Sequence, residues 1–204
     1  MHFIKDIDVA GKKVLLRCDF NVPLDEQGNI SDDFRMRKSL PTIEYLIEQK
    51  AKIIIISHLG EPEGQIVEML RLHKIQARLA ELLKMPVIKA NDCIGEEVKK
   101  QVDDIQEGQV LLLENVRFYK EETDNDTIFA EELSNFGEVY INDAFGDCHR
   151  AHASMVGIPQ FLPSAAGLLL EKEIESLDKV LKNPALPMVA IVGGAKVKTK
   201  AAFI

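Results

Sequence analysis

The chain has 204 residues, of which 46% are hydrophobic and 28% are charged, as in ordinary globular proteins. With 25 Lys and Arg against 33 Asp and Glu, its net charge of −8 argues against general binding to nucleic acid or to anionic membranes. Any anionic ligand must therefore be held by a local group of basic side chains.

The cysteines and the N-terminal stretch indicate the cellular compartment. Cys18, Cys93 and Cys148 are odd in number and widely spaced, which favours free thiols in a reducing compartment over a disulfide framework or a metal site. The stretch MHFIKDIDVAGKK has no apolar signal core, and no segment approaches the roughly 18 apolar residues of a membrane span. We therefore expect a cytoplasmic protein.

The first predicted strand ends in an unusual run of polar residues. Residues 14–16 are apolar, and Arg17, Asp19 and Asn21 then follow at every second position. On a strand, this spacing places the polar side chains on one side. Pro23 ends the run because proline cannot donate to a sheet ladder.

Strands and helices then alternate along the chain. The polar cluster at residues 31–33 predicts the start of a helix, and the long apolar runs predict strands that are buried on both faces. Helices are predicted over residues 34–49, 65–83, 94–102 and 126–136, and strands over residues 51–59, 86–89, 109–117 and 138–145. The predicted fold class is therefore α/β with a mostly parallel sheet.

A second unit is predicted to begin near Pro163. Residues 164–181 are expected to form one long helix that is N-capped by Ser164. A new apolar strand over residues 188–192 leads into a Gly-rich turn at residues 193–196. We therefore divide the chain into an N-terminal domain (1–162), an interdomain helix (163–183) and the incomplete start of a second α/β domain (184–204).

Polar and mostly basic residues follow four of the predicted strands. Because the carboxyl ends of parallel strands share one edge of the sheet, these residues are expected to meet there. Arginine holds carboxylates and phosphates through paired donors, and an acceptor such as Asp19 suits a hydroxyl group on the same ligand. A phosphorylated hydroxy acid fits this set, although each residue alone could be structural or solvated. The set comprises Asp19, Asn21, Arg35, His58, Arg117, His149, Arg150 and His152.

Two further motifs are weaker. His149 and His152 have helical spacing, but no third residue with metal-ligand spacing accompanies them, so we expect no metal site. The turn at residues 193–196 could admit a phosphate to a helix N-terminus, with Lys196 and Lys200 as charges, but a Gly-rich strand end is also a common turn.

Six stretches resemble one family when taken together and in order. RCDFNVP, SHLG, LLENVRF, INDAFGDCHRAHAS, SAAGLLLEKEI and IVGGAKVKTK resemble the phosphoglycerate kinases. The resemblance runs from Lys5 to the last residue and covers the first half of that family's usual chain. It implies two Rossmann-like, three-layer α/β domains that are joined by a helix and close around the substrates.

The resemblance also implies the ligands and the residues that bind them. The N-terminal domain would bind 3-phosphoglycerate or 1,3-bisphosphoglycerate, and the C-terminal domain would bind Mg²⁺ with ATP or ADP. The implied substrate-binding residues are Asp19, Phe20, Asn21, Arg35, His58, Leu59, Gly60, Glu61, Arg117 and Arg150. The implied nucleotide-binding residues are Gly194, Lys196 and Lys200, and Arg35 and Lys196 would be catalytic.

Two places in the sequence depart from the family's pattern. Glu61 stands where the family normally has an arginine after SHLG, so an anion replaces a cation that faces phosphate. The stretch Gly146-Asp147-Cys148 also differs, more mildly, from the small residues that are commoner before HRAH. The first departure puts the affinity for the substrate in doubt.

The expected activity is phosphoryl transfer between the acyl phosphate of 1,3-bisphosphoglycerate and ADP, which needs positioning and charge stabilisation rather than a protein nucleophile. Because the family's later nucleotide motifs fall beyond Ile204, we expect this chain to be inactive by itself. We also expect a monomer. Two alternatives remain open at this point: a module that binds an anion without turnover, and a folding fragment that binds nothing.

Overall fold

The computed structural model describes residues 2–182, 184, 187 and 189. The chain divides into two compact units, Met1–Lys172 and Glu173–Ile204. Most of the strand predicted over residues 188–192 lies outside the described residues. Gly194, Lys196 and Lys200 also lie outside them, so their predicted roles stay predictions.

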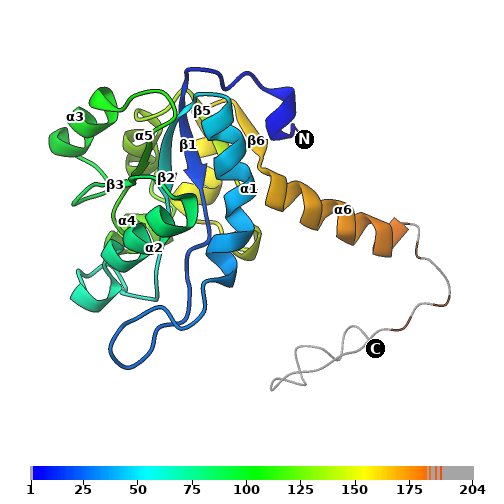
Figure 1. Ribbon diagram of the computed structural model, residues 1–204, viewed down its shortest axis with the longest axis horizontal. Coiled ribbons are helices and arrows are strands. Elements are labelled where there is room, and N and C mark those ends of the chain that lie inside the picture. Colours follow the sequence, from blue (N-terminus) through cyan, green and yellow to red (C-terminus); the bar gives the residue numbers. More distant parts are fainter. Residues whose placement is uncertain (1, 183, 185–186, 188, 190–204) are drawn as a thin grey trace. The chain divides into compact units, whose positions relative to one another are not determined.

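A six-stranded parallel sheet forms the centre of the first unit (Figure 1). The strands lie in the order β3-β4-β2-β1-β5-β6, and every pair of neighbours is parallel. This confirms the predicted α/β class. The strands are β1 (Lys13–Arg17), β2 (Lys52–Ile56), β3 (Ile88–Lys89), β4 (Val110–Leu112), β5 (Val139–Asn142) and β6 (Ser164–Ala166).

Helices cover both faces of this sheet, which gives three layers (Figure 1). Alternate residues of β1 enter separate cores: Leu16 packs in a cluster with Ile43 of α1, whereas Leu15 packs in a cluster with Leu133 of α5. Burial on both faces explains why the strands read as unbroken apolar runs. The helices are α1 (Phe34–Glu48), α2 (His73–Leu83), α3 (Glu96–Asp104), α4 (Lys120–Thr123), α5 (Thr127–Ser134) and α6 (Leu168–Lys182).

The helix predicted over residues 65–83 begins later than expected. Only a short 3-10 turn, Glu68–Leu70, precedes α2. The backbone N–H of Leu72 donates to the buried Glu114 Oε1 at 2.9 Å, and the Leu70 carbonyl accepts from Asn115 Nδ2 at 3.1 Å. These bonds to the segment after β4 hold the chain extended at Arg71, so the prediction of α-helix was wrong for residues 65–72.

The prediction that Ser164 caps a helix was also wrong. Residues Ser164–Ala166 form β6, which pairs with β5 at the edge of the sheet, and α6 begins at Leu168. Ala166 also donates its N–H to the His2 carbonyl at 2.9 Å, so the N-terminal segment closes on the same strand. The last strand of the sheet therefore lies beyond residue 162.

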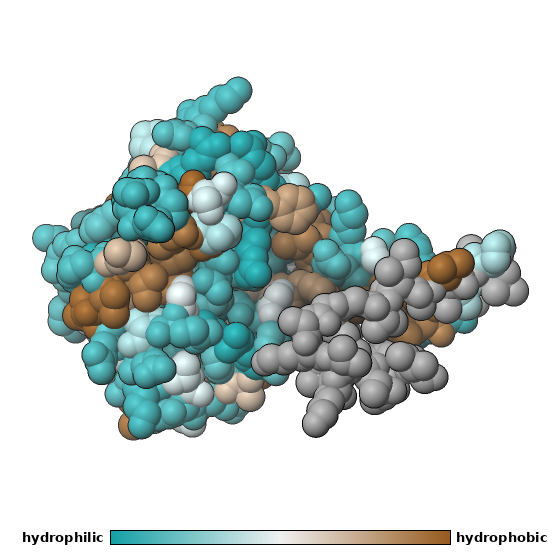
Figure 2. Space-filling model, turned by 90° about the horizontal axis from the view of Figure 1, so that it is seen from below, coloured by the Kyte–Doolittle hydropathy of each residue, from teal (hydrophilic) through white to brown (hydrophobic). Residues whose placement is uncertain are grey.

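Several large apolar side chains are exposed on the described residues, among them Phe34, Ile66, Met69 and Ile128. On the face shown in Figure 2, hydrophilic side chains predominate and apolar side chains gather in separate places. In the second unit, Leu177, Val180 and Leu181 of α6 are exposed. Among the described helices, none combines the length and the apolar character that crossing a membrane requires. The three cysteines are free thiols, as predicted.

Candidate functional site

Three guanidinium groups converge on one carboxylate at the carboxyl ends of the strands. Asp147 follows β5 and lies 3.2 Å from Arg17 Nη2, 3.6 Å from Arg150 Nε and 3.9 Å from Arg117 Nη2. We name Arg17, Arg117 and Arg150 the arginine cluster. They come from the end of β1, the turn after β4 and the loop after β5. The parallel sheet therefore gathers cations at one edge, as its topology favours.

Arg17 is the member of this cluster that the sequence analysis left out of the site. It is fully buried and donates to Ser154 Oγ at 2.9 Å, to the Cys18 carbonyl and to His58 Nδ1 at 3.1 Å. Its position could have identified it, because Arg17 directly continues the apolar run of β1 and is therefore expected to be buried. A buried guanidinium needs several polar partners, which marks a polar cluster at that end of the strand.

A second layer of buried polar groups supports Arg17. Ser154 donates its N–H and Oγ–H to Glu122, at 2.8 and 2.6 Å, and its Oγ accepts from Arg17 Nε. Glu122 is fully buried in α4, a helix that the sequence analysis did not predict. Tyr140 OH donates to the Ser154 carbonyl at 2.7 Å. Glu122 and Ser154 therefore fix the position of Arg17, and through it that of Asp147.

His58 is a neutral member of the site rather than a cation. Its side chain is buried, and its Nδ1 accepts from Arg17 Nη2, which leaves the ring proton on Nε2. Burial lowers the pKa of His58 far below its ordinary range, and the positive charges of Arg17, Arg117 and Arg150 lower it further. Burial also lowers the pKa of His152. The positive charge of the site therefore comes from its arginines rather than from His58.

Asp19 and Arg35 form an ion pair beside the cluster. Arg35 Nη1 lies 2.6 Å from Asp19 Oδ2, and the side chains are 49% and 12% exposed. Asp19 Oδ1 also accepts from the Asn21 N–H at 3.1 Å. A Cβ at Gly146 would lie 2.5 Å from Asp19 Oδ2, so only glycine leaves room for this carboxylate. Asp19 and Arg35 thus lie together, as predicted from the sequence.

The loop after β2 is held between Asn21 and Arg117. The Gly60 N–H donates to Asn21 Oδ1 at 2.8 Å, and the Gly60 carbonyl accepts from Arg117 Nη1 at 2.9 Å. Gly60 has a φ of +65°, and a Cβ there would lie 2.8 Å from Leu70 Cδ2. Asn21 and Gly60 therefore fix the position of Arg117 as well as facing the site.

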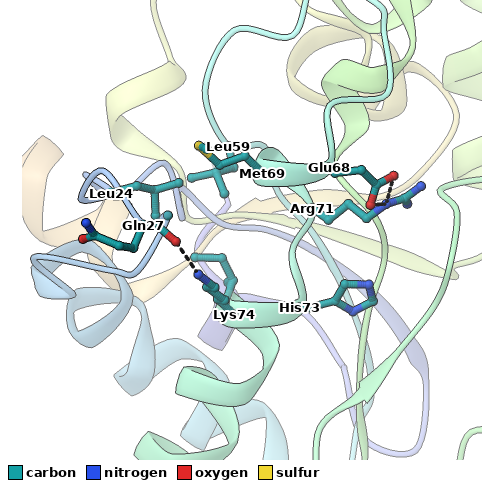
Figure 3. Close-up of a pocket in the computed structure, with 10 residues that line it drawn as sticks. Leu24, Gln27, Leu59, Glu68, Met69, Arg71, His73 and Lys74 are labelled. Atoms are coloured by element: carbon teal, nitrogen blue, oxygen red, sulfur yellow. Dashed lines mark hydrogen bonds and ion pairs between the residues drawn. The ribbon is translucent and has the colours of Figure 1, made fainter.

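Phe20 and Leu59, which the resemblance assigned to the substrate, are buried. Phe20 belongs to the core, and its N–H donates to Ser57 Oγ at 3.0 Å. Leu59 lines a cavity of about 320 Å³, together with Leu24, Met69 and Ile75 (Figure 3). Most of the exposed wall of this cavity is apolar. Its cations Arg71 and Lys74 are engaged by Glu68 and by the Gln27 carbonyl, so we place the candidate site at the arginine cluster instead.

Glu61 and Asp147, one from each departure from the family's pattern, both contact the arginine cluster. Glu61 Oε1 lies 2.8 Å from Arg117 Nη1 and 3.5 Å from Arg150 Nη2. The described residues of the predicted substrate site lie at the ends of the strands or in the segments that follow them, except Arg35, which lies in the first turn of α1. The structure adds Arg17, Glu122, Asp147 and Ser154.

Three potential metal ligands also meet here, among the residues that the structure describes. Single ligand atoms of Asp19, His58 and Asp147 lie within 4.8 Å of one another. However, Arg35 engages Asp19, and Arg17 engages both His58 and Asp147. A divalent cation would have to compete with these guanidinium groups, so this group does not fit a magnesium ion.

Fold and site together define a parallel α/β protein whose arginines gather at the carboxyl edge of its sheet. A family model described as phosphoglycerate kinase matches residues 4–204. The chain belongs to the phosphoglycerate kinase family.

Curated relatives and solved structures agree with this assignment. The chain is 53% identical to a phosphoglycerate kinase of Aquifex aeolicus over 198 residues, and 53% identical to one of Dictyoglomus turgidum over 201 residues. These matches cover 97% and 98% of this chain but 50% of each relative. The chain therefore spans about half the length of the curated relatives it matches.

The solved structures match over a similar share. A phosphoglycerate kinase of Pyrococcus horikoshii superimposes with a TM-score of 0.90 at 34% identity, covering 97% of this chain and 50% of that chain. One of Coxiella burnetii gives a TM-score of 0.85 at 38% identity, covering 97% and 49%.

Proposed function

We propose that this chain is the 3-phosphoglycerate-binding half of a phosphoglycerate kinase. The reaction is reversible phosphoryl transfer between 1,3-bisphosphoglycerate and ADP, which yields 3-phosphoglycerate and ATP in glycolysis. The observation that carries the proposal is the convergence of Arg35, Arg117 and Arg150, from three separate segments, on the edge of the sheet where α/β proteins hold their ligands.

The chemistry of these side chains suits a phosphorylated hydroxy acid. Arg117 and Arg150 offer several N–H donors to the phosphate group, and Asp19 offers an acceptor to the hydroxyl group. Arg35 is half exposed, so its guanidinium group can turn from Asp19 towards a phosphoryl group in transfer. A fixed cation at that point would stabilise the charge that develops on the equatorial oxygens. Lys196, which lies outside the described residues, is proposed to assist.

The nucleotide and its Mg²⁺ are proposed to bind mainly to the part of the curated relatives that this chain does not match. This chain spans about half of each of those relatives. The carboxylates that meet at the described site are already paired with guanidinium groups, so they are not assigned to the metal. The role of this chain's own residues is to bind and orient the phosphoglycerate.

The proposed setting is the cytoplasm, with the protein as a monomer. Two of the three free thiols are buried, Cys18 and Cys93, and no disulfide is formed among the three. Such thiols are typical of a reducing compartment.

Calorimetric titration of the 204-residue chain with 3-phosphoglycerate tests the site. Arg150→Gln should weaken binding, by about tenfold or more for the loss of one charged contact to phosphate. The matched control is Arg78→Gln, because the Arg78 side chain is also 34% exposed and ion-paired but contacts Asp33 and Glu81 instead. Equal affinities of the two variants would refute the placement of the substrate at the arginine cluster.

A further inference from the structure

The carboxylate of Glu61 occupies the position of a bound anion. Its Oε1 lies 2.8 Å from Arg117 Nη1 and 3.5 Å from Arg150 Nη2, so one oxygen is shared by guanidinium groups from two different segments. Phosphate oxygens are held by arginines in the same way. The contact is therefore a substitute, within the chain, for an anionic ligand.

The exposures of these side chains show which group can move. The Arg117 side chain is 1% exposed, that of Arg150 is 34% exposed and that of Glu61 is 59% exposed. Glu61 therefore covers Arg117 from the solvent side. Although buried, Arg117 Nε and Nη2 have no hydrogen-bond partner among the residues that the structure describes, so this guanidinium keeps donor capacity that those residues do not use.

The loop that carries Glu61 is tied down on both sides of it. The Gly60 carbonyl accepts from Arg117 Nη1 at 2.9 Å, and the Gly64 N–H donates to the Arg117 carbonyl at 3.2 Å. A Cβ at Gly64 would lie 2.9 Å from Lys120 Cβ, so the loop is also closely packed there. Release of Arg117 by Glu61 therefore requires rotation of one exposed side chain and no movement of the backbone.

Asp147 differs from Glu61 in this respect. Its side chain is 5% exposed and lies 3.2 Å from the fully buried Arg17, so it is a permanent part of the cluster. Asp147 and Glu61 are the carboxylates that form ion pairs with the arginine cluster, and Glu122 lies behind Arg17 through Ser154. Of the two ion-paired carboxylates only Glu61 can leave, and its departure frees the donors of Arg117 and Arg150 that it occupies.

We infer that Glu61 is an internal competitor for the phosphate group, so that a phosphate monoester binds this site only by displacing the Glu61 carboxylate from Arg117 and Arg150. The inference rests on the proposed function in one respect, the binding of phosphate at the arginine cluster. When a dianionic phosphate displaces Glu61, the negative charge beside Arg117 and Arg150 increases from one to two. When a ligand with a single carboxylate displaces Glu61, this charge does not change. Glu61 thus selects phosphorylated ligands and lowers their affinity.

The test is a calorimetric titration of inorganic phosphate into three forms of the 204-residue chain at low salt: the original chain, Glu61→Gln and Glu63→Gln. Glu63 is exposed, lies in the same loop and carries the same charge, so Glu63→Gln controls for the loss of one negative charge.

Glu61→Gln should bind phosphate about five- to tenfold more tightly than the original chain, because the substitution removes both the competing ion pair and a negative charge that repels phosphate. The gain should shrink as the salt concentration rises. Glu63→Gln should differ from the original chain by less than about twofold.

Equal phosphate affinities of Glu61→Gln and Glu63→Gln, including absence of binding to both, would overturn the inference. A parallel titration with 3-phosphoglycerate separates it from the proposed function. In one possible result, Glu61→Gln gains affinity for inorganic phosphate, but no form binds 3-phosphoglycerate more tightly than phosphate. This result would support Glu61 as a competitor and would refute 3-phosphoglycerate as the substrate. Thermal unfolding of all three forms verifies that each is folded.

Discussion

Arg35 occupies an unusual position for a cation. It lies in the first turn of α1, where the helix dipole disfavours positive charge, and the carboxylate of Asp19 at 2.6 Å compensates for this. With 49% of its side chain exposed, Arg35 is held less tightly than Arg17 or Arg117. These properties suit a residue that changes partners during a reaction.

Replacement of Arg35 should impair the chemical step. In a full-length enzyme that contains this half, Arg35→Ala should lower kcat by at least about 100-fold, because a preorganised charge contact to the transferring phosphoryl group is lost. Steady-state kinetics with both substrates provide the measurement. Arg37→Ala is the matched control, since Arg37 is also on α1, is 53% exposed and pairs with Asp33. An effect on KM alone would leave Arg35 with a role in binding only.

Single side chains also show how far the sequence could predict the site. Arg35, His58, Arg117 and Arg150 were identified because they end or follow predicted strands or begin a predicted helix, and the parallel sheet brings such positions together. Arg17 was missed because its role depends on Ser154, which lies 137 residues away in the sequence. No local pattern indicates that partner.

At the scale of secondary-structure elements, the loop after β2 depends on one backbone conformation. Gly60 has a φ of +65°, and its missing Cβ leaves room for Leu70, which lies just before α2. The backbone N–H of Gly60 donates to Asn21, and the backbone carbonyl of Gly60 accepts from Arg117. The loop thus combines a left-handed turn with close packing, and both need glycine.

Gly60→Ala should therefore lower the free energy of unfolding by more than the backbone strain alone would. We expect the free energy of unfolding to fall by about 2 to 4 kcal/mol, from the positive φ plus the overlap with Leu70. Gly108→Ala provides the comparison, since Gly108 has a φ of +76° but a Cβ there would meet nothing closer than 3.9 Å. It should cost about 1 to 2 kcal/mol. Urea unfolding of both variants gives the difference, and equal losses would contradict the role of the Leu70 contact.

The start of α6 depends on a buried carboxyl group. Asp143 Oδ1 accepts from the N–H groups of Leu169 and Leu170, at 2.9 and 3.4 Å, whereas Oδ2 has no hydrogen-bond partner within the described part of the chain. Burial raises the pKa of Asp143 from its ordinary value of 3.8 to about 6. A Cβ at Gly167 would lie 2.3 Å from Asp143 Oδ1, so the chain approaches this group closely.

Asp143 should make the chain less stable as the pH rises. Between about pH 4 and pH 6 the folded state binds more protons at this group than the unfolded state does, so its contribution to the free energy of unfolding falls and stays low above pH 6. Asp143→Asn should remove this contribution. The variant should therefore gain about 1 to 3 kcal/mol relative to the original chain between pH 4.5 and pH 7.5, as measured by urea unfolding at both pH values. A difference between the two chains that does not change with pH would contradict the assignment.

The incorrectly predicted elements have a common physical cause. The start of α2 was misplaced because Leu72 and Leu70 bond to Glu114 and Asn115, which come more than 40 positions later. The short strand β6 was read as helix because its backbone pairs with β5, while its residues Ser-Ala-Ala carry no strand pattern. Long, periodic elements such as α1 were predicted well because their own sequence dictates them.

At the scale of the whole molecule, the chain should bind but not catalyse. A coupled assay on the purified 204-residue chain should show no kinase activity above a no-enzyme blank, and titration should show weak binding of 3-phosphoglycerate and none of ATP. The reason is that phosphoryl transfer needs both substrates together with water excluded, and the relatives are about twice as long. A separate C-terminal half should restore some turnover if the two halves dock. Activity without any added chain would refute the proposal that the nucleotide site lies elsewhere.

The order of strands in the sheet has a consequence for synthesis on the ribosome. β1 leaves the ribosome first but lies at the centre of the sheet, between β2 and β5, and its Leu15 pairs with both Ile54 and Tyr140 (Figure 1). A nascent chain that has passed β4 but not reached β5 therefore carries its central apolar strand with one edge unpaired. Such an edge is a template for mispairing with other chains. Nascent chains of this intermediate length are thus the ones that should need a chaperone, until β5 and then β6 have emerged and the N-terminal segment can close on Ala166.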